Sequence, residues 1–360
     1  MRVQPMKRRR SSGVVTALAI AAALGGLATH ADPAPRARGH RHHSATREPT
    51  TRHGRPIRIP LTSHPSAFAP PTNPAGGTAP ARPYDHVLII SLDGMRPDAI
   101  DMTDAPNLRR IREQGANATE SRTITHSYTL PSHSSMLTGV DTDRHGLTHN
   151  SFNPTRPFIR FPTIFYRAHD AGLATAMFVS KPKFRHIAVP GTVDVFARPD
   201  YHCERVVGAA SQYLTTVGAG ITFVHLSEPD EAGHSRGWMT ESYLRNVASA
   251  DRCVGTLMAT LSARADRHRF LVIISADHGG HGRTHGSQRD EDMRIPWIAW
   301  GANVRRGAFA TPVSTMDTAA TALVALGLPM PSDIVGRPVR IALDGPAPLA
   351  RRRAPHRRPP

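Results

Sequence analysis

His-Ser-Tyr-Thr-Leu-Pro-Ser-His-Ser-Ser-Met-Leu-Thr-Gly, residues 126–139, places the hydroxyl of Thr129 just before a short run that predicts the first turns of a helix. Its proline suits a first turn, because the missing N–H would have no partner there. A hydroxyl at this point faces free backbone N–H groups and the positive end of the helix dipole, which favour an anion such as phosphate. A threonine before a helix is more often an ordinary N-cap, so the rest of the chain must distinguish the two roles.

Around this stretch the chain alternates between buried-strand patterns and amphipathic patterns. Short apolar runs predict strands at 86–92, 174–179, 221–226, 270–276 and 295–300. Helical patterns occur at 105–114, 163–171, 203–217, 241–264 and 318–326. Strands that alternate with helices predict an α/β fold with a mainly parallel sheet covered on both faces. Residues 84–345 suffice for one large domain with a substantial core.

The ends of the chain differ in composition from this domain. We predict a signal peptide at 1–31, a flexible Pro/Ala/Arg/His-rich segment at 32–82, a folded domain at 83–345 and a basic disordered tail at 346–360. The signal has a basic start (Lys7 to Arg10), an apolar run (Val14 to Leu27) and a cleavage site at Thr29-His30-Ala31. The apolar run falls short of the roughly 18–20 residues of a spanning helix, and an uncleaved anchor is the alternative. We therefore expect export to the periplasm or the medium, with the twin-arginine route left open.

The net charge of +17 is concentrated in the ends. Residues 1–60 hold 12 lysines and arginines against two acidic residues, and residues 351–360 hold five arginines against none, which leaves +2 for 61–350. This distribution argues against a nucleic-acid-binding groove in the domain. Weak electrostatic contact of the basic ends with an anionic envelope surface is one expectation, and no partner for them is the other.

The chain has two cysteines, Cys203 and Cys253. In an exported protein they form one disulfide or remain two buried thiols, and both alternatives stay open here. Their number and spacing exclude a metal site built on cysteine.

Acidic and histidine side chains follow several of the predicted strands. Asp93 comes directly after the first strand, Asp230 and His234 follow the strand at 221–226, and Asp277-His278 follow the strand at 270–276, with His285 shortly after. The carboxyl ends of parallel strands meet at one edge of a sheet, so these groups can converge. Divalent ions, zinc above all, take such Asp/His sets. A single strand-end aspartate is commonly a turn residue, but that explanation fits four such groups poorly.

The full set of motifs resembles the alkaline phosphatase superfamily, in its nucleotide pyrophosphatase/phosphodiesterase-like (type I phosphodiesterase) branch. The resemblance covers Tyr84 to Val339. It rests on Leu92-Asp93-Gly94, Thr129-Leu130-Pro131-Ser132-His133, Thr138-Gly139, His145-Gly146, Glu228-Pro229-Asp230 with His234, Asp277-His278-Gly279, His285-Gly286, Asp317 to Thr321 and Gly336 to Val339. It implies an alkaline phosphatase-like three-layer α/β/α sandwich, with 83–345 as the catalytic domain.

The resemblance also implies two divalent metal ions, usually zinc. Asp230, His234 and His285 would hold one ion; Asp93, Asp277 and His278 would hold the other, with Thr129 bound to it as the nucleophile. Asn150 stands where the family places an amide that binds a phosphoryl oxygen. His281 competes with His285 for its role, and the glycine and the Asp-Met-Arg-Ile-Pro run that follow favour His285. The family's Phe-Pro-Asn-His is Leu-Pro-Ser-His here, and the loop near His285 lacks a long insertion found in vertebrate members.

Two lysines, Lys181 and Lys183, follow the strand at 174–179. They resemble the paired lysines of phosphonoacetate hydrolase, a member of the same superfamily. As substrate-binding cations in the pocket they would favour a doubly charged phosphate or a carboxylate-bearing substrate. The competing interpretation is a solvated basic loop.

The expected function is therefore an exported two-metal phosphoric ester hydrolase that works through a phospho-threonine intermediate on a small phosphoester. A phosphodiesterase or nucleotide pyrophosphatase is the leading subclass. A phosphomonoesterase or phosphonate hydrolase with the same site is the runner-up. A catalytically inactive metal-binding envelope protein is a remote alternative, disfavoured by the intact set of ligands and Thr129.

Overall fold

The computed structural model describes residues 82–345. The predicted domain, 83–345, falls within this range. The predicted signal peptide, all but the last residue of the flexible segment, and the basic tail lie outside the described residues.

The strands form where the sequence is apolar on both faces. In β1 (His86–Leu92) every residue is buried, as in β6 (Gly220–Leu226) and β7 (Phe270–Ser275). Such continuous burial is typical of parallel strands with helices on both sides. The other strands are β2 (Ala116–Ala118), β3 (Ser121–Arg122), β4 (Ala174–Val179), β5 (Val195–Ala197), β8 (Trp297–Gly301), β9 (Gly307–Phe309) and β10 (Val313–Ser314).

Eight of the described strands form one sheet in the order β5-β4-β6-β1-β7-β8-β2-β9. The neighbours from β5 to β7 pair in parallel, with His86 opposite Gly220 of β6 and Phe270 of β7. β8 is antiparallel to both of its neighbours, whereas β9 pairs with β2 in parallel. β10 and β3 form a separate two-stranded sheet. The predicted α/β fold with a mainly parallel sheet is thus confirmed.

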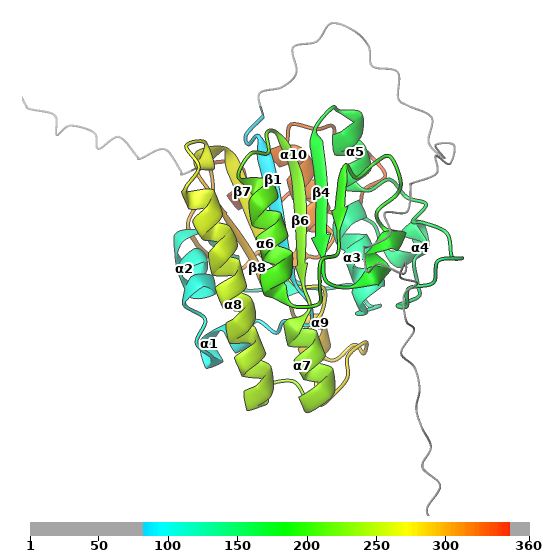
Figure 1. Cartoon of the computed structure of the whole chain (residues 1–360), viewed down its shortest axis with the longest axis vertical. Helices are drawn as coiled ribbons and strands as arrows, with labels where there is room; N and C mark the ends of the chain where they lie inside the picture. The colour runs from blue at the N-terminus through cyan, green and yellow to red at the C-terminus, as the bar shows by residue number, and fades with distance from the viewer. Residues whose placement is uncertain (1–81, 346–360) are drawn as a thin grey trace, which may run out of the picture. The chain divides into compact units, whose positions relative to one another are not determined.

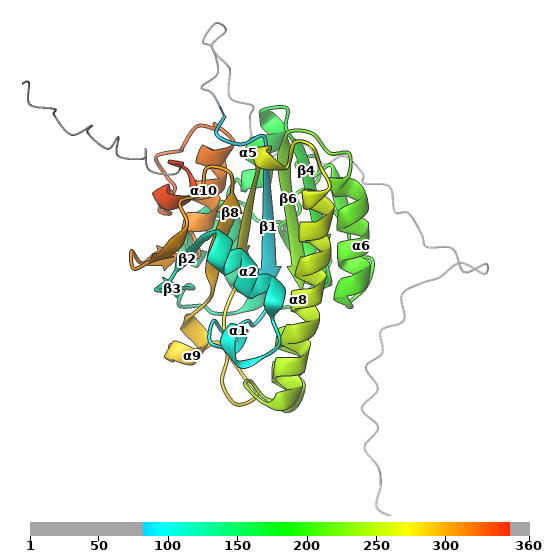
Figure 2. The same ribbon diagram turned by 90° about the vertical axis from the view of Figure 1, so that its left-hand side faces the viewer.

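Helices cover both faces of the large sheet (Figures 1 and 2). One face carries α2 (Pro106–Gln114), α6 (Cys203–Leu214) and α8 (Glu241–Ser262), and the other carries α3 (Thr129–Thr138), α5 (Ile164–Asp170) and α10 (Asp317–Ala325). The shorter elements are α1 (Ala99–Met102), α4 (Thr142–His145), η1 (Pro182–His186), α7 (Glu228–Arg236), η2 (Arg267–Arg269), α9 (Asp290–Met293) and η3 (Arg340–Ala342).

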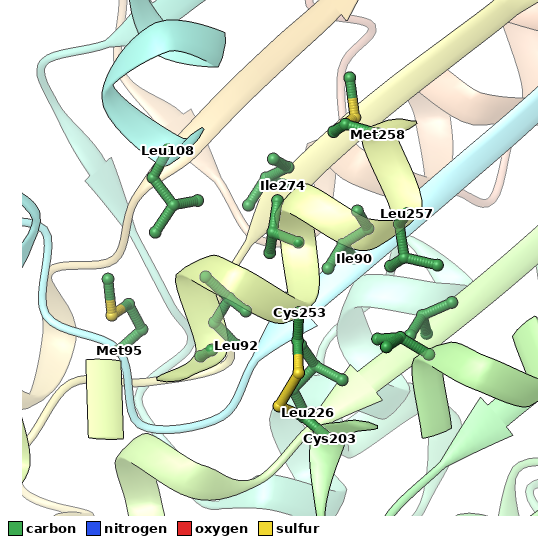
Figure 3. Packing of buried hydrophobic residues seen from close by; sticks show 14 of the residues in the cluster. Ile90, Leu92, Met95, Leu108, Cys203, Leu226, Cys253, Leu257, Met258 and Ile274 are labelled. Atoms are coloured by element: carbon green, nitrogen blue, oxygen red, sulfur yellow. A yellow bond between two sulfur atoms is a disulfide. The ribbon is translucent and has the colours of Figure 1, made fainter. Parts of the chain in front are cut away.

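The core is divided by the sheet into two apolar layers, because successive residues of a strand point to opposite faces. Leu88, Ile90 and Leu92 of β1 pack toward α8, whereas Val87 and Ile89 pack toward the opposite helices. Figure 3 shows the first layer, with leucine and isoleucine side chains from β1, β6 and β7 against α8.

Cys203 and Cys253, both buried members of that layer, form a disulfide, which resolves the open alternative (Figure 3). The bond joins the first residue of α6 to the middle of α8, with the two Cα atoms 6.1 Å apart.

The largest difference from the sequence prediction concerns the segment after β6. The sequence analysis assigns no helix to the run Glu228 to His234, yet this run forms most of α7 (Glu228–Arg236). Pro229 in the first turn and Gly233 near the end obscure its helical pattern, although a proline is well tolerated at a helix start. Asp230 and His234 are therefore one helical turn apart on one face of a helix.

Within residues 82–345, no helix combines the length and apolar character needed to cross a membrane.

Candidate active site

The candidate site lies at the carboxyl ends of four neighbouring parallel strands. Asp93 directly follows β1, and Asp277 comes two residues after β7. Asp230 lies in the first turn of α7, which begins two residues after β6, and Lys181 comes two residues after β4. The strand order β4-β6-β1-β7 brings these side chains to one edge of the sheet, where open parallel sheets bind their ligands.

Gly94 allows the close approach of two of these segments. Its φ is +68°, and an added Cβ would lie 2.9 Å from the Cα of Asp230, so both the backbone angle and the space favour glycine. Its carbonyl accepts hydrogen bonds from Trp238 Nε1 (2.9 Å) and Tyr243 OH (3.0 Å), and its N–H donates to Asp277 Oδ1 (3.1 Å). The loop that carries Asp93 is therefore held from three directions.

Asp93, Asp277 and His278 form the first ligand group, and all three are fully buried. His278 Nε2 lies 3.4 Å from Asp93 Oδ1 and 3.2 Å from Asp277 Oδ2. His278 Nε2 is thus the common neighbour of both carboxylates. It also lies 4.0 Å from Asp230 Oδ1, and ligand atoms of Asp93, Asp230 and His278 all lie within 4.8 Å of one another, so Asp230 lies between the two ligand groups.

Asp230, His234 and His285 form the second ligand group. Asp230 Oδ1 lies 3.4 Å from His234 Nε2 and 3.7 Å from His285 Nε2. One ligand atom from each of the three lies within 4.8 Å of the other two, the spread expected around a single ion. Asp230 and His285 are buried, whereas the side chain of His234 is 46% exposed, so this group lies nearer the solvent.

The histidines of both groups present Nε2 to the site, because their Nδ1 atoms face backbone carbonyls. His278 Nδ1 lies 2.8 Å from Gly279 O, His285 Nδ1 lies 2.8 Å from Ser127 O, and His234 Nδ1 lies 3.2 Å from Arg283 O. A carbonyl only accepts, so Nδ1 carries the proton and Nε2 keeps its lone pair. Burial lowers the pKa of His278, and burial with the neighbouring His278 lowers the pKa of His285 to about 3. Both rings are neutral near pH 7, as metal ligation requires.

The carboxylates differ in their electrostatic surroundings. Burial, with repulsion from Asp93 and Asp230, raises the pKa of Asp277 well above its usual range. Burial alone would also raise the pKa of Asp93, but the Lys181 ammonium and the hydrogen bond from His225 lower it well below that range. Three acidic groups so close together need a compensating positive charge.

Four ligand atoms of the site have no hydrogen-bond partner among the described residues. They are Asp93 Oδ1, Asp230 Oδ1, Asp277 Oδ2 and His278 Nε2. Buried polar atoms without partners are rare and carry a desolvation penalty, so their convergence indicates a missing cation. Carboxylate oxygen and imidazole nitrogen are also the donors that zinc and similar ions take. The residues present therefore fit two divalent ions, one for each ligand group.

Thr129 is the first residue of α3, and the N-cap of that helix is Tyr128. Because Tyr128 occupies the N-cap position, Thr129 is not the N-cap residue of this helix. Thr129 lines a cavity of about 320 Å³ together with Asp230 and His285. The structure thus places Thr129 at a helix start, on the wall of the cavity that Asp230 and His285 also line.

Asn150 and Lys183 lie together on the wall of the same cavity. Asn150 Oδ1 accepts hydrogen bonds from Leu130 N (2.9 Å) and from Lys183 Nζ (3.1 Å). Both donors bind the oxygen, so the amide orientation is set and its NH₂ remains as the donor for a ligand. Burial, with repulsion from Lys181, lowers the pKa of Lys183.

Lys181 occupies a different environment from Lys183. Its side chain is 7% exposed, and Nζ lies 2.8 Å from Asp93 Oδ2 and 2.5 Å from Asp230 Oδ2. This position differs from the solvated loop that was the competing interpretation. The two attractive carboxylates outweigh burial and raise the pKa of Lys181 above its usual value, so it is an ammonium.

Two neighbours of the ligand groups have supporting positions. His281, the competitor of His285, pairs through Nδ1 with Asp292 Oδ1 at 2.7 Å, and the second ligand group contains His285 in its place. Glu228 accepts a hydrogen bond from the backbone N–H of Cys203 at the start of α6.

The sequence interpretation missed two buried histidines that contact the first ligand group. His225 Nε2 lies 2.8 Å from Asp93 Oδ2, and His133 Nδ1 lies 3.4 Å from Asp277 Oδ2. A signal for His225 was present, because an imidazole interrupts the otherwise apolar end of the buried strand β6. His133 was seen only as part of the motif that begins at Thr129.

Aromatic side chains complete the cavity wall. Phe152 and Tyr201 line it with the lysines, and they are 39% and 48% exposed. Exposed aromatic rings beside a polar site offer a surface for stacking a flat organic group.

The fold and the ligand groups define an alkaline phosphatase-like α/β/α protein. Comparison with known proteins identifies the family within this class. A sequence model of the type I phosphodiesterase/nucleotide pyrophosphatase family matches residues 87–288. The chain belongs to this family, which confirms the resemblance.

Curated relatives include the mouse ectonucleotide pyrophosphatase/phosphodiesterase family member 7, 24% identical over 226 residues, covering 56% of this chain and 51% of the relative. The bovine bis(5'-adenosyl)-triphosphatase ENPP4 is 24% identical over 224 residues, covering 57% of this chain and 49% of that protein. The chain thus spans about half the length of these relatives.

Among solved structures, an inactive murine ectonucleotide pyrophosphatase/phosphodiesterase 5 in complex with AMP is similar, with a TM-score of 0.60 at 15% identity. The match covers 68% of this chain and 96% of that one. Phosphonate monoester hydrolase of Agrobacterium radiobacter has a TM-score of 0.56 at 15% identity, covering 74% of this chain and 78% of that one. At this identity the likeness shows the fold.

Proposed function

We propose that this chain is a two-metal phosphoric ester hydrolase that acts on phosphodiesters or nucleotide pyrophosphates through a phospho-threonine at Thr129. The observation that carries the proposal is the convergence of unpartnered ligand atoms from Asp93, Asp230, Asp277 and His278 at the strand ends. Thr129 and Asp230 line one cavity there. Membership of the family supports the same reaction class.

The first ligand group would hold one ion together with Thr129, and the second ligand group would hold the other. Zinc suits both sets of donors. Two bound divalent ions would supply electrostatic stabilisation of the attacking and leaving oxygens in an in-line displacement. The Nδ1 contacts of the three histidines keep their Nε2 atoms directed at the site, which is the usual role of such outer partners.

In the reaction, Thr129 Oγ1 would bond to phosphorus as the ester bond to the leaving group breaks. The proton lost by the hydroxyl is balanced by protonation of the leaving oxygen. Water then hydrolyses the phospho-threonine, which releases the phosphoryl product and restores the hydroxyl. The start of α3 favours the negative charge that develops near Thr129, because helix N-termini attract anions.

Asn150 would hold a non-bridging phosphoryl oxygen through its NH₂ group. Its oxygen is already bonded by Leu130 N and Lys183 Nζ, so the donor is oriented before substrate arrives. Donors fixed in this way stabilise transition-state charge without reorganisation.

The cavity wall favours a diester. A monoester carries nearly two charges and gains from further cations, yet the Lys181 ammonium is already paired with two carboxylates. Phe152 and Tyr201 offer stacking surfaces for a nucleobase or an aryl group. The AMP complex of the murine relative supports a nucleotide substrate.

The second candidate is a phosphomonoesterase or phosphonate hydrolase with the same site. It is favoured by Lys183, whose Nζ lies beside Asn150 on the cavity wall and would bind a second charge or a carboxylate. The likeness of fold to a phosphonate monoester hydrolase is compatible with this candidate.

We also propose that the protein is exported and that its basic ends contact anionic envelope surfaces weakly, with no specific binding of nucleic acid. Support comes from the signal-like composition of 1–31, from the charge of the ends and from the Cys203–Cys253 disulfide, which is typical of oxidising compartments.

A substrate panel on purified, zinc-loaded protein tests the proposal. We expect bis-p-nitrophenyl phosphate or a dinucleoside polyphosphate to be cleaved faster than p-nitrophenyl phosphate. Chelation should abolish activity, and zinc should restore it. A clear preference for the monoester that disappears in Lys183→Met would establish the second candidate. Absence of activity on every phosphoester, in protein that binds two zinc ions, would contradict both.

A further inference from the structure

Lys181 touches both ligand groups at once. Its Nζ pairs with Asp93 of the first group and Asp230 of the second, and Glu231 Oε1 lies 3.8 Å away at the solvent side. The side chain is buried, so the ion pairs are poorly screened by water. A cation in this place contributes to the arrangement of both carboxylates.

The oxygens that Lys181 binds differ from those left without partners. It contacts the Oδ2 atoms of Asp93 and Asp230, whereas the Oδ1 atoms of the same residues have no hydrogen-bond partner among the described residues. The ammonium therefore does not occupy the ligand positions. Each carboxylate offers one face to Lys181 and the other to its ion site, so lysine and metal can be bound together.

His225 supports only one of the two carboxylates. Its Nε2 lies 2.8 Å from the same Asp93 Oδ2, and its Nδ1 lies 2.8 Å from Ser180 Oγ. Because the Asp93 carboxylate only accepts, Nε2 of His225 carries the proton and donates to it, and Nδ1 accepts from the Ser180 hydroxyl. Ser180 and Lys181 are neighbours in the chain, so the turn after β4 supplies the lysine that pairs with Asp93 and the serine that contacts His225 of β6.

We propose that Lys181 is a built-in counter-ion shared by the two metal sites, and that His225 is a positioning residue for the first site alone. The inference rests on the two-metal site of the proposed function. It assigns Lys181 to metal binding and leaves Lys183 as the lysine that meets substrate. Loss of a partner that orients a metal ligand typically weakens metal binding by roughly 10–100-fold.

The test compares Lys181→Met, Lys181→Arg, His225→Gln and Lys183→Met with the wild-type full-length protein. Apo-protein is titrated with zinc against a chromophoric chelator, and bound zinc is counted by elemental analysis. In Lys181→Met we expect affinity at both sites to fall by roughly 10–100-fold, with partial recovery in Lys181→Arg because the positive charge returns. In His225→Gln we expect one site to weaken and the other to keep its affinity. Lys183→Met, the matched control on the same turn, should bind both ions as the wild type does.

Each alternative outcome identifies a different error. Wild-type protein that binds no zinc would refute the proposed function itself. Unchanged affinity in Lys181→Met, with two ions bound and a raised KM, would make Lys181 a substrate-binding residue. Tighter zinc binding in Lys181→Met would show that the ammonium competes with the metal. Weaker zinc binding at both sites in His225→Gln would refute the assignment of His225 to the first site alone. This variant tests that assignment even if Lys181→Met fails to fold.

Discussion

Replacing Asn150 by aspartate separates the two functions that the structure gives to this side chain. Aspartate keeps the oxygen that accepts from Leu130 N at 2.9 Å and from Lys183 Nζ at 3.1 Å. It loses the NH₂ donor proposed for the phosphoryl oxygen, and it adds a negative charge beside an anionic substrate. Asn150→Asp should therefore preserve the local structure while impairing catalysis.

The expected loss of activity can be estimated from hydrogen-bond donors in comparable positions of other enzymes. Loss of one such donor lowers kcat by about 10²–10³-fold, or about 3–4 kcal/mol of transition-state stabilisation. The added charge should bring Asn150→Asp at least to the upper end of this range. In Asn150→Ala the loss of kcat should lie near the lower end of this range. This variant also removes the acceptor of two hydrogen bonds, each of which contributes about 1 kcal/mol to stability.

The assay is steady-state hydrolysis of bis-p-nitrophenyl phosphate by zinc-loaded enzyme, with zinc content and thermal unfolding measured on the same preparations. Both variants should bind two zinc ions, because Asn150 is not a ligand. Wild-type rates in Asn150→Asp would refute the donor role. Loss of zinc in either variant would refute the separation of Asn150 from the metal site.

Three further predictions concern the metal ligands, acid stability and the chain ends. His285→Ala should lose one zinc ion and most activity, whereas His281→Ala should retain both, and elemental analysis distinguishes this from the reverse assignment. Burial lowers the pKa of His86 to about 4, so the unfolded state takes up this proton first as the pH falls. The neutral state of His86 therefore contributes roughly 3 kcal/mol to the free energy of unfolding above about pH 6.5, and this contribution is lost by about pH 4. Denaturant unfolding of metal-free protein at several pH values should show that His86→Gln loses less of its free energy of unfolding as the pH falls. Deleting 32–75 and 351–360 should leave rates on small substrates unchanged and weaken any salt-sensitive adhesion to anionic vesicles, whereas a large loss of activity would move the predicted domain boundary.

The fold was predictable because its signals are local. Apolar runs such as 86–92 and 270–275 are buried on both faces, and this pattern is visible without knowledge of any neighbour. The strand-end positions of Asp93 and Asp277 follow directly from those runs. The antiparallel direction of β8 was not predictable, because strand direction depends on the path of the intervening chain.

Contacts that depend on strand order could not be predicted to the same degree. Lys181 meets Asp93 and Asp230 only because β4, β6 and β1 are neighbours in the sheet. His225 reaches Asp93 for the same reason, and the pairing of β1 with β6 places Ser91 opposite His225. A pattern along one segment contains no information about which side chain of another strand will lie beside it.

The most direct test of the central claim is to trap the covalent intermediate. Wild-type enzyme is mixed with a slow phosphodiester substrate and quenched in acid within milliseconds to seconds, and its peptides are analysed by mass spectrometry. The account predicts a phosphoryl adduct on Thr129, and it predicts that Thr129→Ala loses both the adduct and several orders of magnitude in turnover while two zinc ions remain bound. An adduct on another residue, or near-normal turnover by Thr129→Ala, would contradict it.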